Sequence, residues 1–499
     1  MDLTDGYVQE IDYTHGYCGE IAPPLIDLAL VSRGAGGTAR GRPLRYLELG
    51  FGQGVSLNIH AAACPGEYWG VDFNRTHLEN ARGLTAASGS GALLFGDAFE
   101  TFAVREDLPQ FDVIAMHGTW SWISAGNRRV VVDLVRRHLA LKGVFYVSYN
   151  CWPGWATEMP LRHLLVQHAE AAAASGKSLG ARIDASLDFA ESLMKAGAKY
   201  FEAHPELDAW LRDMRTRSRR YLAHEYFNRD WHPMPFSEVA QALSAAGLSF
   251  AASADIGENL DGPGLSGAAV QFLEGVSGTV MRETTKDYLA DRRFRRDLFA
   301  RDPAPENAKG LFERMRDLPF TLLQHPDHVP DAATLGGDRV ALDAAVYRPV
   351  VEAMAANAYA PQRLRDLQQH PKCAGIPAPK LAEAALVLTG MGSLHPVQAR
   401  EAIDEAAPRC KALNERILEL ASPAVRMRAL ASPVTGAGVF LAPQEMAFLR
   451  AIAKGLASED EWARHAWESL GEGDPGVLRA EARAFARVRL PVLKALRVA

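Results

Sequence analysis

The sequence predicts an α/β protein in which a doubly wound parallel sheet is followed by mostly helical regions. Short apolar runs and helical segments alternate regularly between residues 44 and 150, as expected for a parallel sheet with helices on both faces. The alternation then stops, and helical patterns dominate the rest of the chain. With 499 residues the chain is too long for one compact core, so we expect two to four domains.

The alternating part defines its elements in chain order, after a Tyr-rich lead-in and a Gly-rich linker at residues 32–41. The carboxyl ends of parallel strands meet at one edge of the sheet, which is where open α/β sheets bind their ligands. The expected strands are residues 44–49, 68–72, 92–95, 111–116 and 143–149, and the expected helices are residues 55–63, 76–87 and 125–139.

Residues 152–232 have a helical pattern and interrupt the alternation, which resumes with a helix at 236–246 and an apolar run at 248–252. We therefore expect a helical insertion that lies above the strand ends and shapes a substrate site. A Gly/Pro junction at 261–264 predicts a domain boundary. The predicted domains are residues 1–260 with the insertion, a middle region at 261–345, and a winged-helix-like C-terminal domain at 346–499.

Composition excludes several classes of function. The net charge of −6 gives no general attraction for nucleic acid, and we expect the basic runs at 212–220 and 292–301 to be solvated helix faces. No apolar run reaches the roughly 20 residues of a membrane span, and the N-terminus lacks the features of a secretory signal. The five scattered cysteines form no CxxC pair. We expect a cytoplasmic protein without a metal site, a membrane span or a nucleic-acid partner.

The most informative segment follows the first expected strand and reads Glu48-Leu-Gly-Phe-Gly-Gln-Gly54. Glycines at 50, 52 and 54 allow a ligand to approach the backbone closely and permit positive φ. A dinucleotide fingerprint would need its third glycine at position 55, where the chain has Val55. The spacing E-x-G-x-G-x-G instead resembles motif I of class I S-adenosylmethionine-dependent methyltransferases.

Two acids after the next strands agree with this resemblance. Asp72 ends the second strand, where a carboxylate can accept hydrogen bonds from both ribose hydroxyls, and Asp97 follows the third. Methyltransferases of this class place an acid near the adenine amino group at the position of Asp97. The cofactor that the resemblance implies is S-adenosylmethionine, and its predicted binding residues are Glu48, Gly50, Phe51, Gly52, Gly54, Asp72, Phe73, Asp97, Ala98 and His117.

The fourth strand ends in His117-Gly-Thr-Trp-Ser-Trp122, and in the resembled fold this segment faces the transferred methyl group. The Asn/Asp-Pro-Pro-Tyr segment typical of methylation on bases or glutamine is absent, which argues against those acceptors. His117 has three interpretations at this stage: a proton acceptor, a cofactor contact, or a hydrogen-bonded structural residue.

Aromatic residues cluster in the sequence around the same strand ends. They suit an alkyl-ammonium acceptor, because a cation gains energy over an aromatic face, but they would equally fill the core beneath the insertion. Within the insertion, the segment at 221–227 has two interpretations: Glu225 and Tyr226 hold or deprotonate the acceptor, or His224 and Glu225 cap and pair structurally. The aromatic residues in question are Trp120, Trp122, Tyr149 and Trp152.

Several segments together resemble bacterial class I methyltransferases with an appended methyltransferase regulatory domain, a group that includes protein lysine methyltransferases. The matches are residues 13–17, 48–54, 70–74, 117–122, 147–150, 221–227 and 431–436. The resemblance implies a Rossmann-like core, a regulatory middle region and a winged-helix-like C-terminal domain. We predict His117, Tyr149, Glu225 and Tyr226 as catalytic residues, and Tyr13, His15, Trp120, Trp122 and Trp152 as substrate-binding residues.

The main functional hypothesis is in-line methyl transfer to a nitrogen of a protein side chain, with lysine as the acceptor that the resemblance implies. One alternative is a small-molecule O- or N-methyltransferase of secondary metabolism. Another is a cofactor-sensing regulator that binds DNA through its C-terminal domain, although the net acidity counts against it. The sequence leaves a homodimer open.

Overall fold

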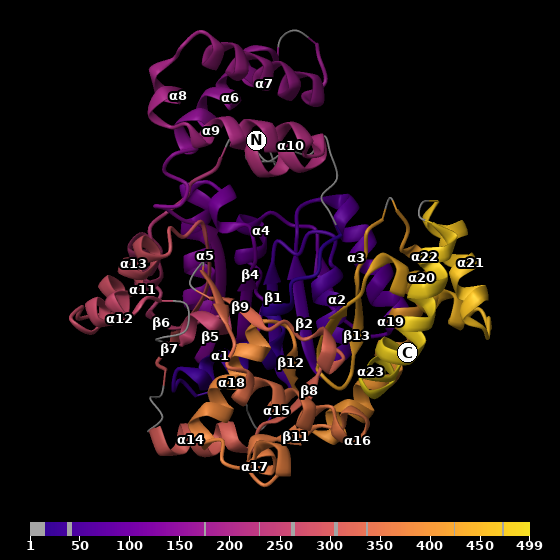
Figure 1. Cartoon of the computed structure of the whole chain (residues 1–499). Helices are drawn as coiled ribbons and strands as arrows, with labels where there is room; N and C mark the ends of the chain where they lie inside the picture. Colours follow the sequence, from indigo (N-terminus) through magenta and orange to yellow (C-terminus); the bar gives the residue numbers. More distant parts are fainter. Residues whose placement is uncertain are drawn as a thin grey trace.

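The computed structural model describes residues 15–36, 42–173, 176–228, 230–260, 265–303, 308–335, 338–423, 425–471 and 474–499. A seven-stranded sheet with the order β3-β2-β1-β4-β5-β7-β6 lies at its centre (Figure 1). The strands β1 to β5 run parallel, and β7 is antiparallel to both of its neighbours. The strands are β1 (Leu44–Leu49), β2 (Gly66–Val71), β3 (Leu93–Phe95), β4 (Phe111–Met116), β5 (Leu139–Asn150), β6 (Leu248–Ser253) and β7 (Phe294–Arg301).

Helices cover both faces of the sheet, which confirms the predicted doubly wound arrangement. Because side chains alternate along a strand, Tyr46 of β1 joins the apolar cluster on the α1 side while Leu47 joins the cluster of α5 and α11. Ser124 and Asn74 begin two of these helices by accepting hydrogen bonds from backbone amides of the first turn. The helices are α1 (Pro23–Ser32), α2 (Val55–Ala63), α3 (Arg75–Ser88), α4 (Phe99–Ala103), α5 (Ala125–His138) and α11 (Phe236–Ser244).

The expected insertion is a helical bundle between β5 and α11, and Figure 1 shows it above the sheet, on the side where α4 lies. It has an apolar cluster of its own, which includes Leu165, Ile183, Leu211 and Leu222. The bundle consists of α6 (Met159–Ala171), α7 (Leu179–Lys195), α8 (Lys199–Ala203), α9 (Glu206–Thr216) and α10 (Arg219–Tyr226).

The structure of the basic run at 292–301 differs from two predictions, that of a solvated helix and that of a domain boundary at residue 260. It is not a solvated helix but contains β7, and Arg295 within it is only 2% exposed. Buried carboxylates of Glu283, Asp287 and Asp297 contact the Arg295 guanidinium, which is why so basic a strand can lie inside a sheet. Since β7 is part of the central sheet, that sheet extends past the boundary predicted at residue 260. The connection from β6 to β7 contains α12 (Gly267–Glu274) and α13 (Thr279–Leu289).

The predicted boundary at residues 345 and 346 also divides a sheet. In this three-stranded sheet β8 (Pro319–Leu322) lies between β11 (Gln362–Arg363) and β12 (Leu394–Pro396). The middle region and the C-terminal part are therefore continuous. The other elements of this region are α14 (Ala308–Asp317), β9 (Ala332–Leu335), β10 (Asp338–Ala341), α15 (Ala344–Met354), α16 (Ala356–Tyr359), α17 (Leu364–Leu367) and α18 (Ala378–Gly390).

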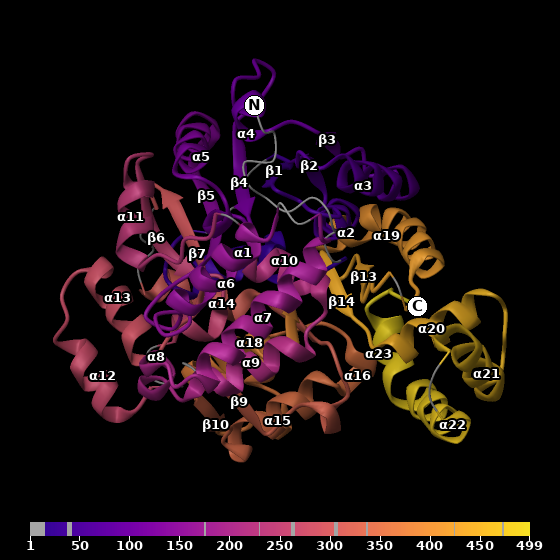
Figure 2. The same ribbon diagram turned by 90° about the horizontal axis from the view of Figure 1, so that it is seen from above.

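The last hundred residues pack on the outer side of the first domain, where α19 (Arg400–Leu420) contacts α2 and α3 (Figure 2). A hairpin of β13 (Ala429–Ser432) and β14 (Ala437–Phe440) follows it. The helices after the hairpin are α20 (Pro443–Ala453), α21 (Glu459–Leu470), α22 (Pro475–Ala484) and α23 (Leu490–Ala495). The winged-helix character of this part stays a prediction.

Within the described ranges, no helix is both long and apolar enough to cross a membrane. The same ranges hold no group of three or more His, Cys, Asp or Glu residues placed to bind a metal ion.

Candidate functional site

The glycine loop forms the turn from β1 into α2, and its three glycines have positive φ angles of 74°, 56° and 72°. A Cβ atom at Gly54 would lie 2.4 Å from the Cβ of Ala81 in α3, and one at Gly50 would lie 2.8 Å from Thr119 Oγ1. Only glycine therefore allows this turn to pack so closely against α3 and against the loop after β4.

Asp72 connects the glycine loop to the end of β2. Its Oδ2 accepts a hydrogen bond of 2.8 Å from the Gly52 amide, and its Oδ1 accepts one of 2.9 Å from the Asn74 amide. The His77 ring nitrogen Nδ1 lies 3.3 Å from the same Oδ1. The carboxylate is thus held rigidly at the strand end where the sequence predicted it.

Glu48 is the unusual group of the site. It is 4% exposed, and its Oε2 is buried without a hydrogen-bond partner among the described residues. Burial, with a further contribution from the negative charge of Asp72, raises the pKa of Glu48 to about 8. Buried polar atoms almost always have partners. An orphaned carboxylate beside a tight glycine loop therefore fits a ligand that brings a positive charge or hydrogen-bond donors.

The remaining predicted cofactor residues are spread over neighbouring strand ends. Asp97 follows β3 with 30% of its side chain exposed, and its Oδ2 lies 3.7 Å from Arg105 Nη1. Ala98 comes directly after Asp97 and is the N-cap residue of α4. Phe51 is buried against β2, where a Cβ atom at Gly70 would lie 2.8 Å from Cδ1 of the Phe51 ring. Phe73 directly follows Asp72 on the loop after β2.

His117 follows β4 and is the centre of a polar cluster. Its Nδ1 lies 2.9 Å from the Tyr146 hydroxyl, 3.4 Å from Ser148 Oγ and 3.7 Å from Glu20 Oε1. Glu20 in turn accepts a hydrogen bond of 2.9 Å from Nε of Arg296 in β7. Burial lowers the pKa of His117, so the imidazole is neutral and can accept a proton.

Tyr149, which we predicted as a catalytic residue, does not lie beside His117. It lies on the opposite face of β5 from Tyr146, where its buried hydroxyl donates a hydrogen bond of 2.7 Å to Asp297 Oδ2. Tyr146 is the tyrosine that contacts His117. The alternation of side chains along residues 143–149 was the signal for it, because Tyr146 and Ser148 share one face. Glu20 and Arg296 were also missed, because Glu20 lies just outside the matching segment at 13–17 and Arg296 belongs to the basic run that was interpreted as a solvated helix face.

Some of the aromatic residues that we predicted as walls of a substrate site instead fill the core. Trp120 is 1% exposed and packs edge-on against Phe145, so it belongs to the core and not to a substrate wall. The Trp152 ring nitrogen donates a hydrogen bond of 3.1 Å to the Pro233 carbonyl oxygen. Trp122 instead lies against Trp231, with 6.1 Å between ring centroids.

Trp122 is one end of an aromatic cluster at the base of the insertion. Trp231 contacts Trp155 at 5.2 Å between centroids, and Trp155 contacts Tyr226 at 6.1 Å. The guanidinium of Arg162 lies 4.9 Å above the Trp231 ring. Tyr226 is buried within this cluster, and its pKa is raised by burial and by the negative charges around it, including that of half-buried Glu225. Both residues therefore lie among aromatic rings of the insertion, and not in the polar cluster of His117. Trp155 and Trp231 were not predicted.

The N-terminal segment, which we define as residues 15–21, brings Glu20 to His117. It begins at half-buried His15, and the predicted residue Tyr13 lies outside the described residues. The Cys18 amide donates a hydrogen bond of 2.9 Å to Ser56 Oγ at the start of α2. The segment is thus attached to the same helix that the glycine loop begins.

Comparisons with known proteins agree with this geometry. The family described as "predicted methyltransferase regulatory domain" matches residues 218–301, which begin before the region at 261–345 where we predicted the regulatory part and overlap its first portion. An uncharacterized Synechocystis protein, sll1526, is 33% identical over 441 residues, covering 88% of this chain and 86% of that protein. The Rickettsia prowazekii protein RP789 is 25% identical over 258 residues, covering 51% of this chain and 45% of that protein.

Among solved structures, PKMT2 from Rickettsia typhi in complex with AdoHcy has the same fold. The TM-score is 0.71 with 18% sequence identity, over 97% of this chain and 99% of that one. The glycine loop, the acids at successive strand ends and the full-length relative all lead to one assignment. The chain belongs to the family of the Synechocystis protein sll1526, its residues 218–301 match the methyltransferase regulatory domain, and its fold is that of PKMT2.

Proposed function

We propose that the protein transfers a methyl group from S-adenosylmethionine to the side-chain nitrogen of a lysine in another protein. The observation that carries the proposal is the orphaned Glu48 carboxylate beside the glycine loop and Asp72. Asp72, together with a Glu48 carboxyl that a nearby positive charge would ionise, suits a cofactor with a positively charged sulfur and no phosphate. A lysine acceptor is supported by the fold shared with PKMT2 of Rickettsia typhi, a protein lysine methyltransferase.

The residues at the strand ends have the chemistry to hold this cofactor, which supplies an electrophilic methyl group when bound. Gly50, Gly52 and Gly54 leave the backbone open to close approach. Asp72 would accept hydrogen bonds from the ribose hydroxyls, and Asp97 would accept one from the adenine amino group. Phe51, Phe73 and Ala98 complete the proposed binding set by their positions in the same loops.

His117 is the group we assign to the acceptor's proton. A lysine ammonium has no lone pair, so it must lose a proton before its nitrogen can attack the methyl carbon while the carbon–sulfur bond breaks. Burial keeps His117 neutral and ready to take that proton. The Glu20 carboxylate, 3.7 Å away, would stabilise the resulting imidazolium, and the Tyr146 hydroxyl orients the ring.

The aromatic cluster at the base of the insertion is the proposed approach for the acceptor. The rings of Trp122, Trp155 and Trp231 would form an aromatic wall for an alkyl-ammonium group, and half-buried Glu225 lies on α10, next in the chain to Tyr226 of the cluster. In this proposal Glu225 and Tyr226 bind the acceptor at the base of the insertion, and His117 acts where the methyl group arrives.

Incubation of the protein with a bacterial lysate and S-adenosylmethionine labelled in its methyl group tests the proposal. We expect label in protein, recovered as methyl-lysine after acid hydrolysis, and no label with the Asp72→Ala variant. Label confined to the small-molecule fraction would contradict a protein acceptor and favour the secondary-metabolism alternative. Label in neither fraction, with the cofactor bound normally, would contradict catalysis itself.

A further inference from the structure

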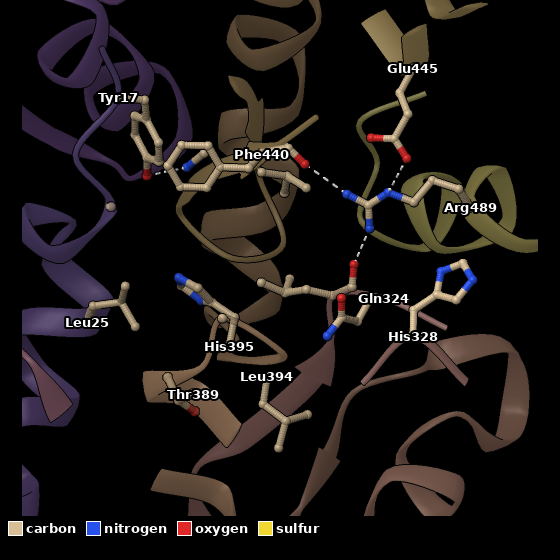
Figure 3. Close-up of a pocket in the computed structure, with 15 residues that line it drawn as sticks. Tyr17, Leu25, Gln324, His328, Thr389, Leu394, His395, Phe440, Glu445 and Arg489 are labelled. Carbon is tan, nitrogen blue, oxygen red and sulfur yellow. Dashed lines mark hydrogen bonds and ion pairs between the residues drawn. The ribbon is translucent and has the colours of Figure 1, made fainter. Parts of the chain in front are cut away.

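A cavity of about 360 Å³ lies where three parts of the chain meet, and none of its lining residues belongs to the proposed methyl-transfer site (Figure 3). Tyr17 of the N-terminal segment and Leu25 of α1 line one side. Gln324, just after β8, and His395 of β12 line a second. Phe440 of β14 lines the third. The volume is that of a small-molecule site.

The walls of the cavity are largely apolar and aromatic. The rings of Tyr17 and Phe440 meet edge to face with 5.2 Å between centroids. Leu25, Leu394 and Val439 add aliphatic surface. Aromatic walls of this kind suit a flat, apolar ligand.

The one arginine of the cavity wall has its charge compensated. Arg489 lies 3.2 Å from the Glu445 carboxylate, and it donates hydrogen bonds to the carbonyl oxygens of Phe440 and Leu323. An ionic ligand would find no uncompensated arginine or glutamate there. The occupant that fits is neutral.

Hydrogen-bond acceptors define the polar chemistry of the cavity. His395 is buried, and its Nδ1 donates a hydrogen bond of 2.7 Å to the Pro396 carbonyl oxygen. Burial lowers the pKa of His395 to about 4, so Nε2 carries no proton and is an acceptor. This Nε2 has no hydrogen-bond partner among the described residues. The Gln324 amide donates to Ser393 Oγ, which leaves its carbonyl oxygen as a second acceptor.

We propose that this cavity binds a neutral aromatic or heteroaromatic small molecule that donates an N–H or O–H hydrogen bond to His395 Nε2. The ring of the ligand lies against Tyr17 and Phe440. Figure 3 shows the His395 imidazole directed from β12 toward these two rings, so one flat molecule can satisfy the acceptor and fill the aromatic walls.

The ligand would contact the segment that completes the methyl-transfer site. The Tyr17 hydroxyl oxygen accepts a hydrogen bond of 2.6 Å from the Gly438 amide and lies 3.2 Å from His60 Nε2. Glu20, which contacts His117 and Arg296, follows three residues later. A ligand packed on Tyr17 therefore holds the N-terminal segment in place. Its influence on methyl transfer rests on the proposed function, whereas its binding does not.

Titration calorimetry of the full chain with indole and with 1-methylindole tests the site, because the two probes share a ring and only indole donates a hydrogen bond. We expect indole to bind roughly five- to tenfold more tightly. His395→Leu should abolish that difference, and Phe440→Ala should weaken both probes. Phe272→Ala is the matched control, since Phe272 on α12 is 62% exposed and Phe440 is 58% exposed.

Hydrogen exchange of the Cys18 amide is a second readout that needs no enzymatic activity. Indole should slow this exchange in the wild type and leave it unchanged in Phe440→Ala. Equal binding of the two probes, binding that survives His395→Leu, or no binding would overturn the site. Indole binding without any methyl transfer would preserve the site and contradict the proposed function instead.

Discussion

Two buried glutamates, Glu283 and Glu48, have opposite electrostatic surroundings. Glu283 of α13 is 5% exposed, and Arg295 and Lys286 lie within 3.2 Å of its carboxylate. Burial alone would raise the pKa of Glu283, but these two cations lower it below its ordinary value. Glu48 is 4% exposed, and its pKa is raised to about 8 by burial and by Asp72.

The difference separates a carboxylate that stabilises the fold from one that is kept for a ligand. The network of Arg295 supplies the positive charge that α13 and β7 need to pack together. At the end of β1 the protein supplies no such charge, and a cationic cofactor would. A buried acid without a cation is costly to the folded state, which is the expected signature of a functional site.

The largest expected effect is on stability, when the Arg295 guanidinium is removed from the network around Glu283. Arg295→Leu leaves the carboxylates of Glu283, Asp287 and Asp297 buried without their common partner, and should lower the free energy of unfolding by about 3–5 kcal/mol. Urea unfolding of the purified protein measures this. Arg339→Leu is the control, because that side chain is 79% exposed and should change stability by less than about 0.5 kcal/mol. A small effect of Arg295→Leu would show that the network does not stabilise the fold.

The next largest effect is on cofactor binding by the acids near the glycine loop, Asp72 and Glu48. Asp72→Ala removes a rigidly held acceptor and should weaken S-adenosylmethionine binding by about 2–3 kcal/mol, measured by calorimetry. Asp107→Ala removes an exposed acid near the same strand ends and should leave the affinity unchanged. Wild-type affinity in Asp72→Ala would show that the cofactor lies elsewhere.

Glu48 should make stability depend on pH in a direction that the Arg295 network does not share. Its pKa is about 8 in the folded protein and 4.5 ordinarily, so the folded state holds a proton that the unfolded state has lost. The resulting stabilisation is complete below pH 4.5 and disappears as the pH rises through 8. Between pH 6 and 8 the unfolding free energy of the wild type should fall by about 2 kcal/mol relative to Glu48→Gln. Parallel pH profiles of the two proteins would contradict the raised pKa.

The smallest effect distinguishes the two tyrosines of β5. Tyr146→Phe loses the hydroxyl that contacts His117 and should lower kcat roughly three- to tenfold with little change in KM. Tyr149→Phe loses a hydrogen bond to Asp297 and should cost about 1 kcal/mol of stability without changing kcat. If the two variants exchanged their phenotypes, the original prediction of Tyr149 as catalytic would be restored.

The sequence predicted the parts of the fold that depend on local patterns. The strand ends carrying Glu48, Asp72 and Asp97 lie where alternation placed them, because each follows a short apolar run. β7 was missed because its arginines were interpreted as a solvated helix face. Arg295 can be buried because it pairs with Asp297 of the same strand and with Glu283 and Asp287 of α13, which lie 12 and 8 residues earlier in the chain.

The candidate site was predictable only where its residues share a motif. The glycine loop and His117 belong to continuous segments, so the chain itself brings their neighbours together. Glu20 and Arg296 are 276 residues apart, and only the packing of the N-terminal segment on the sheet joins them. Trp120 and Trp122 are also alike in the sequence. Trp120 packs in the core against Phe145 and Trp122 packs against Trp231, a difference that only the folded chain determines.

A crystal structure of the protein with S-adenosylhomocysteine bound would test most directly whether the uncompensated acids are a cofactor cradle. The account predicts the ligand across the glycine loop, with its ribose hydroxyls on Asp72, its adenine amino group at Asp97 and its sulfur on the side of His117. Electron density for the ligand at any other place, with the loop and Glu48 unchanged, would contradict it.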